Sequence, residues 1–294
     1  MHERLRIGMS ETQGPSTTDR KEKAVMKQAT TVWVKLAAVT AAVVLAGVTW
    51  ADSLTWNVTG YTGTWDLSST NWTGDDTVFA NGDDVAFPTF RSLGVISPGR
   101  TDSHYSSRTI TVDGGGVSPN SILFRPAEIN YLHFAGGDIG GAAGITVDST
   151  WDANQAQLWF DRNASYSFTG GVTVEEGCHV YYKPSTAGTY SLGTGQIHIK
   201  DVAGGQTTSI NYEPTVTGTT LTTPIHAQSG TTTFNWGNAP TFTGNLTLDS
   251  NIFFNSVGGA GEYFDWNGNV ILTGDRTIIG GVRDLGSAPA VVRT

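Results

Sequence analysis

Three stretches of the sequence decide the fold, and all three carry one pattern. They are SFTGGVTVEEG at 167–177, TFTGNLTLDSN at 241–251 and FDWNGNVILTGD at 264–275. In each, an aromatic residue precedes a glycine, and apolar residues follow two and four positions after that glycine. The glycines Gly170 and Gly244 lie 74 residues apart, and the third follows Gly244 by 24 residues. These spacings predict repeating units, or rungs, of about 25 residues, with three rungs between Gly170 and Gly244.

Between and around these stretches, apolar and polar residues alternate with a period of two, as in RTITVDGGG and GQIHIKD. After Asp52 no stretch shows a sustained helical period, so the sequence predicts an all-β fold. A single rung cannot bury its apolar face, whereas stacked rungs share a core with strands about 4.8 Å apart. We therefore expect a parallel β-helix (solenoid), with glycines at corners where φ is positive. A sandwich stays the alternative, because NGDDVAF and VDGGGVS resemble hairpin turns.

The segment 26–51 predicts export. Lys27 and Lys35 are basic, an apolar run follows them, and small residues precede a cleavage site between Ala51 and Asp52. This pattern is typical of a signal-peptide helix. The alternative is an uncleaved segment that anchors the chain in a membrane, which would be its only membrane contact.

The chain is expected to divide into four parts. Residues 1–25 precede the signal segment and are polar, so they indicate a disordered leader or a mis-assigned start. The signal segment is followed by an N-terminal cap region at 52–109 and a repeat region at 110–294.

Composition excludes some functions. Residues 52–294 carry 10 Lys or Arg against 22 Asp or Glu, and only two of these are lysines, Lys183 and Lys200. A nucleic-acid partner is excluded, because phosphate binding needs clustered cations. The one cysteine, Cys178, allows no intramolecular disulfide, and we expect it to be a small apolar residue within a strand.

The order of several short motifs resembles one family. The segment LTWNVTGYTGTWDLSSTNWTGDDTVFANGDDVAFPTF at 54–90 contains Thr55-Trp56, Asn71-Trp72 and Asn81-Gly82-Asp83 with Val85 and Phe87. The segment 110–149 adds Pro119-Asn120-Ser121-Ile122 with Phe124, then Tyr131, Phe134, Gly136-Gly137 and the run 139–146. Together they resemble the opening of autotransporter-associated β-strand repeat proteins, and the later FTG segments resemble the repeat itself.

The resemblance covers most of 54–275. It implies a right-handed β-helix, export from a bacterium and a passenger or surface role without a catalytic centre. The sequence shows no C-terminal anchoring pattern, so we expect a released protein or a truncated copy of a longer one.

Trp56, Trp65 and Trp72 form an aromatic cluster in the N-terminal region. They predict either a platform on which a sugar stacks or a hydrophobic cap over the first rung, and the cap is favoured because an open solenoid end must be covered.

Two pairs of carboxylates, Asp75-Asp76 and Asp83-Asp84, lie on expected loops. They suggest weak Ca²⁺ ligands or solvated turn residues, and their spacing favours turns. His133, His179 and His198 alternate with apolar residues and are expected to face outward. We predict no metal, no cofactor and no catalytic residue.

The expected function is an exported, non-enzymatic structural or adhesive element at the cell surface of a Gram-negative bacterium, either extracellular or in the periplasm or outer membrane. Its expected partners are surface polysaccharides or other cell-surface proteins, and an open rung edge also suggests self-association. The alternative is a carbohydrate-binding or polysaccharide-degrading β-helix, a lyase or hydrolase. That alternative would need a site such as Asp161, Arg162, Glu175, Glu176 and Lys183 on one face.

Overall fold

The structure is a computed structural model. It describes residues 52–58, 62–88, 106–126, 130–149, 156–201, 207–257, 264–282 and 290–292. All of them belong to one compact unit, residues 51–294. The predicted leader and signal-peptide segment, residues 1–51, lie outside the described residues and stay predictions.

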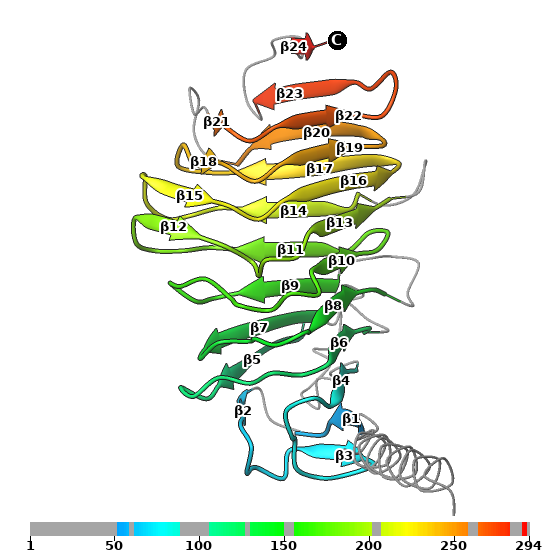
Figure 1. Ribbon diagram of the computed structural model, residues 1–294, viewed down its shortest axis with the longest axis vertical. Helices are drawn as coiled ribbons and strands as arrows, with labels where there is room; N and C mark the ends of the chain where they lie inside the picture. Colours follow the sequence, from blue (N-terminus) through cyan, green and yellow to red (C-terminus); the bar gives the residue numbers. More distant parts are fainter. Residues whose placement is uncertain are drawn as a thin grey trace, which may run out of the picture. The chain divides into compact units, whose positions relative to one another are not determined.

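The described residues form β-strands and no helix, which confirms the predicted all-β class (Figure 1). The first of three sheets contains β1 (Ser53–Trp56), β3 (Trp72–Gly74), β4 (Asp84–Phe87), β6 (Ser121–Phe124), β8 (Gly144–Val147), β10 (Val172–Val174), β13 (Ile197–Lys200), β16 (Ile225–Ser229), β19 (Leu246–Leu248) and β22 (Val270–Leu272). The second contains β2 (Thr62–Trp65), β5 (Ser106–Val112), β7 (Asn130–Gly136), β9 (Ala156–Phe160), β11 (His179–Tyr182), β14 (Ser209–Tyr212), β17 (Thr231–Trp236), β20 (Asn251–Ser256), β23 (Ile278–Val282) and β24 (Ala290–Val292). The third contains β12 (Gly188–Tyr190), β15 (Thr219–Leu221), β18 (Thr241–Phe242) and β21 (Asp265–Trp266).

From β4 to β23 the chain alternates between the first and second sheets, and from β12 to β21 it also passes through the third sheet in each turn (Figure 1). Strands of successive turns pair within each sheet. The pairing is parallel except at two ends, where β3 pairs antiparallel with β1 and β24 with β23. A hairpin joins antiparallel strands, so the hairpins that a sandwich would need do not connect neighbouring strands in these parallel ladders. No helix that could cross a membrane occurs in the described part of the chain.

The register matches the spacing of the repeated sequence. Val172 pairs with Ile197, Ile197 with Ile225, and Ile225 with Leu246. Three turns therefore separate Val172 from Leu246, and one further turn places Val270 beside Leu246. The parallel pairing already begins between β1 and β4, and β5 crosses the predicted boundary between 52–109 and 110–294.

The core lies between the sheets and is built from the alternate, inward residues of each strand. In the first sheet the inward residues of successive turns include Ile145, Val172, Ile197, Ile225 and Leu246, all buried. In the second sheet one inward column is aliphatic from β7 to β14, and the next is aromatic and in register from strand to strand: Phe134, Phe160, Tyr182, Tyr212 and Trp236. Burying these large side chains supplies the main driving force for folding.

The repeated glycines are required for a different reason from the one expected. None of Gly170, Gly244 and Gly268 has a positive φ, so the predicted corner conformation is wrong for them. Each instead lies against the backbone of the preceding turn. A Cβ atom on Gly244 would lie 2.3 Å from the carbonyl oxygen of Thr223, and one on Gly268 would lie 2.0 Å from that of Gly244. Only a residue without a side chain permits this approach.

Cys178 is buried but lies immediately before β11, in the connection from β10, rather than within a strand as expected. Burial raises the pKa of its thiol well above the usual range, with nearby carboxylates adding to the effect. This thiol is therefore a core residue and not an activated nucleophile.

Candidate functional site

The three N-terminal tryptophans lie in one aromatic cluster at the β1–β3 end of the first sheet. Trp72 packs edge-on against Trp56, with ring centroids 4.9 Å apart, and against Trp65 at 5.5 Å. Phe87 contacts all three. The side chains of Trp56, Trp65 and Trp72 are 4%, 0% and 2% exposed. A sugar stacks only on an exposed ring face, so these indoles offer no platform.

The paired carboxylates of the same region accept hydrogen bonds from the protein. Asp75 accepts from the backbone amide of Ser53 at 2.9 Å, and Asp83 accepts from that of Ala80 at 2.7 Å. Asp84 accepts from two side chains of β6 and its preceding turn. Asp76 accepts from the amide that follows it. Among the described residues, no group of three or more His, Cys, Asp or Glu side chains could hold a metal ion.

The five charged residues considered for an enzyme do not form one group. Asp161 contacts His133, and Arg162 contacts Asp138 at 2.7 Å. Glu175 follows the first-sheet strand β10 and pairs with Lys200 at 2.8 Å. Lys183 follows the second-sheet strand β11 and pairs with Glu213 at 2.6 Å. Glu176 forms no ion pair with another residue in the described part of the chain. Asp161 and Lys183 therefore follow neighbouring strands of the second sheet, whereas Glu175 lies at the end of a strand of the first sheet.

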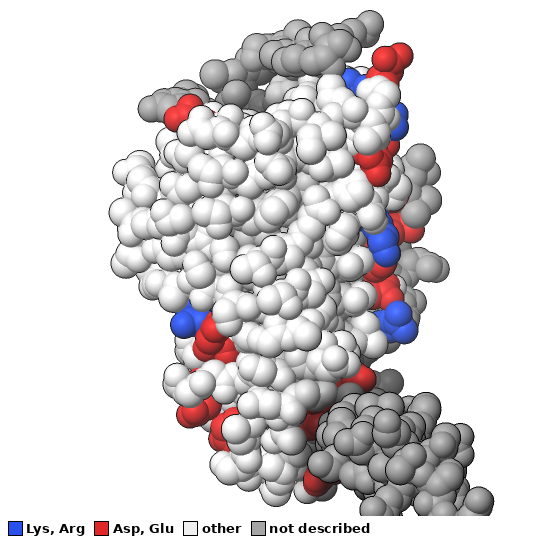
Figure 2. All heavy atoms as spheres, viewed as in Figure 1, with Lys and Arg blue, Asp and Glu red and all other residues white. Residues whose placement is uncertain are grey.

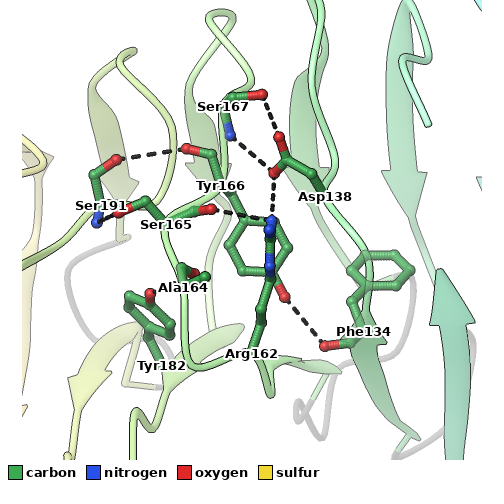
Figure 3. Close-up of polar contacts among 9 residues, drawn as sticks. All are labelled: Phe134, Asp138, Arg162, Ala164, Ser165, Tyr166, Ser167, Tyr182 and Ser191. Atoms are coloured by element: carbon green, nitrogen blue, oxygen red, sulfur yellow. Dashed lines mark hydrogen bonds and ion pairs between the residues drawn. The ribbon is translucent and has the colours of Figure 1, made fainter. Parts of the chain in front are cut away.

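Figure 3 shows the corner that holds Arg162. Asp138 accepts from Arg162 and also from the backbone amide and hydroxyl of Ser167, at 3.2 and 2.5 Å. Arg162 also donates to the carbonyl of Ser165 at 3.0 Å. The buried hydroxyl of Tyr166 donates to the carbonyl of Phe134 at 3.2 Å, and burial raises its pKa beyond the usual range. The bonds of Asp138 and of the Tyr166 hydroxyl join neighbouring turns, so this corner helps to fix how the turns stack.

A column of stacked rings lies on the outer face of the second sheet, and sequence reasoning did not find it. Trp159 pairs in register with His133 and Tyr181. Its ring stacks on His133 with centroids 5.0 Å apart and on Tyr181 at 4.0 Å, nearly parallel. Lys183 Nζ lies 4.7 Å from the centroid of Trp159. Because the rings cover one another's faces, this column presents ring edges outward.

Burial on this face shifts two pKa values. Desolvation lowers the pKa of His179 to about 4, so this imidazole is neutral at neutral pH. His179 Nδ1 lies 2.7 Å from the hydroxyl of Ser209. Desolvation also raises the pKa of Tyr181 to about 12, with the carboxylate of Glu213 adding to the shift. The expected outward orientation of His133, His179 and His198 is confirmed by their alternation with buried residues.

The column continues as asparagines. Asn235 donates to Asn211 at 2.6 Å, and Asn255 donates to Asn235 at 2.8 Å. Such a ladder satisfies one amide with the next and requires identical residues in register.

The third sheet carries the most regular exposed columns. Thr189, Thr220 and Thr241 are register partners on its outer side. Two residues after each of them come Ser191, Thr222 and Thr243, so the strands read Thr-Tyr-Ser, Thr-Leu-Thr and Thr-Phe-Thr. The middle residue of each triplet is buried. Figure 2 shows no charged side chain over β12, β15 and β18.

Comparison of the chain with protein-family models, with characterised proteins and with solved structures finds no match.

Proposed function

We propose that residues 52–292 form a right-handed parallel β-helix, and that the region of Trp56, Trp65 and Trp72 caps its N-terminal end. The parallel ladders and the return of the chain to the same sheet after each turn support a solenoid. Parallel crossover connections are right-handed in nearly all proteins, which supports the handedness. The antiparallel pairing of β3 with β1 and the burial of the three tryptophans support the proposed cap.

The proposed function is that of an exported, non-enzymatic structural or adhesive element at the surface of a bacterium, of the autotransporter-associated β-strand repeat type. The main support is that the same polar residue recurs in register on successive strands of the outer surface, as in the Thr and Asn columns. Figure 2 shows a broad face without charge, with Lys, Arg, Asp and Glu along its margins. Such a surface makes many weak, repeated contacts, which suits adhesion to polysaccharide or to other surface proteins.

Export is tested with the full chain in a Gram-negative host. We expect protein outside the inner membrane whose N-terminal residue is Asp52. Leu45→Arg, which interrupts the apolar run, should hold the chain in the cytoplasm. Uncleaved wild-type protein in the cytoplasm would contradict export. Adhesion is tested by binding of the purified protein to whole cells and to a glycan array.

A carbohydrate-active site is the second candidate, and one observation favours it. Asp161, Lys183 and Glu213 directly follow the neighbouring strands β9, β11 and β14, beside the Trp159 ring. Two carboxylates therefore flank a lysine, and the Cα atoms of Asp161 and Glu213 lie about 10 Å apart across the sheet, which is two strand spacings. Lyase and reducing-end assays on polysaccharides test this candidate. Turnover that Glu213→Gln abolishes, while Glu175→Gln does not, would replace adhesion by catalysis as the function.

A further inference from the structure

The outer side of the third sheet is a two-dimensional array of hydroxyl and methyl groups. Its two columns run across β12, β15 and β18, and the fourth strand, β21, continues them with Asp265 and Asn267. The array of Thr and Ser therefore extends over three neighbouring strands and ends at the charged residue Asp265.

The spacing of this array follows from strand geometry. Neighbouring parallel strands lie about 4.8 Å apart, which sets the distance along each column. Residues i and i+2 of one strand lie about 6.6 Å apart, which sets the distance between the columns. Thr side chains are stiff because their Cβ atom is branched, so they hold this spacing with little freedom.

The first column has hydroxyl groups that are available to an external partner. Those of Thr189, Thr220 and Thr241 make no hydrogen bond with any described residue. The second column differs, because Thr222 donates to the carbonyl of Tyr190 at 3.1 Å. Thr189 and Thr243 are exposed, and the others are half-buried. The side chains of Tyr190, Leu221 and Phe242 are buried beneath the array and anchor its strands to the core.

We propose that this surface binds ice. Water oxygens on a prism face of ice repeat in two perpendicular directions at distances close to the two spacings of the array. Each Thr hydroxyl can replace or hold one lattice water, while its methyl group lies against the neighbouring water without binding it. A charged side chain would order water differently, and none lies within the three Thr and Ser rows. Crystalline polysaccharide fits less well, because it needs exposed ring faces, and the aromatic residues of β12 and β18 point inward.

This inference goes beyond the proposed function and requires only the geometry of the third sheet, so either can fail without the other. The test uses the purified full chain. A cold probe is held in dilute protein while ice grows slowly, and the protein in the ice and in the liquid is measured. Inhibition of ice recrystallisation is measured in parallel. We expect the protein to concentrate in the ice and to keep ice grains small.

Two variants and one matched control decide the assignment. Thr220→Lys and Thr241→Lys place a charge in the centre of the array and should lower the captured fraction about tenfold, equal to about 1.4 kcal/mol. Thr247→Lys changes an equally half-buried Thr on the outer side of the first sheet and should leave capture unchanged. Circular dichroism establishes that all three fold.

Three results would overturn the proposal. The first is exclusion of the wild-type protein from ice. The second is an equal effect of Thr247→Lys and Thr220→Lys. The third is sedimentation with crystalline cellulose or chitin without capture by ice, which would assign the array to polysaccharide.

Discussion

Replacing Gly244 by alanine tests the close stacking of turns. The added Cβ would lie 2.3 Å from the carbonyl oxygen of Thr223 and 2.5 Å from its carbon, both in the backbone of the preceding turn. A carbon and a carbonyl oxygen in contact lie about 3.3 Å apart, so the turns would have to separate by about 1 Å. Gly244 cannot simply shift toward the next turn, because Gly268 of that turn approaches the carbonyl of Gly244 just as closely.

The expected cost follows from these contacts. Overpacking of a well-packed interior costs about 1–3 kcal/mol, and alanine returns about 0.4–1 kcal/mol by restricting the unfolded chain. We therefore expect Gly244→Ala to lower the free energy of unfolding by about 1–2 kcal/mol.

Guanidinium unfolding of the full chain, followed by tryptophan fluorescence, measures this effect. Gly114→Ala is the matched control, because a Cβ there meets no atom within 4 Å and φ is not positive. The control should be neutral or slightly stabilising. If Gly244→Ala and Gly114→Ala unfold at the same denaturant concentration, the turns do not approach as described.

Three further predictions concern stability. Leu246→Ala should cost about 2–5 kcal/mol in denaturant unfolding, whereas Val270→Ala in the same column should cost less than half of that, because Val270 is 46% exposed. Between pH 6.5 and about 4, His179 is protonated in the unfolded chain but not in the folded chain. The contribution of neutral His179 to stability is therefore complete above pH 6.5, and the free energy of unfolding should fall by up to about 3 kcal/mol as the pH drops to about 4. His179→Gln should remove that part of the slope. Asp138→Ala removes one carboxylate that accepts from both Arg162 and Ser167 and should cost about 1–3 kcal/mol, whereas Glu175→Gln removes a single ion pair and should cost less than about 1 kcal/mol. Equal thermal shifts for the two would contradict the network of Figure 3.

The stacked core could be predicted from the sequence because its signal is periodic. Val172, Leu246 and Val270 hold equivalent places after their glycines, and the structure puts them in one column with Ile197 and Ile225 between. The turns between Val172 and Leu246 lack the glycine motif, so only the 74-residue spacing between Gly170 and Gly244 indicated them.

The function of the repeated glycine could not be predicted, because a positive φ and a close backbone approach select the same residue. Only the contact with the previous turn, such as that of Gly244 with Thr223, distinguishes them.

The outward columns were not predicted, because the alternation of apolar and polar residues identifies only the inward positions of a strand. The sequence does hold a signal for the aromatic column: Trp159 and Phe160 are adjacent, as are Tyr181 and Tyr182, and only one of two neighbours in a strand can face inward. The Thr-x-Thr triplets at 220–222 and 241–243 were likewise visible, but their register depends on the length of the connecting loops.

Crosslinking in register tests the central claim most directly, since the account depends on successive turns pairing in parallel. Thr173 and His198 are register partners, so their Cα atoms lie about 4.8 Å apart, within the range of a disulfide. Thr173 and His226 are two strands apart, at about 9.6 Å, which is beyond that range. In a Cys178→Ala background, the account predicts rapid disulfide formation in Thr173→Cys/His198→Cys and none in Thr173→Cys/His226→Cys. Failure of the first pair in the folded protein, or equal rates for both, would contradict it.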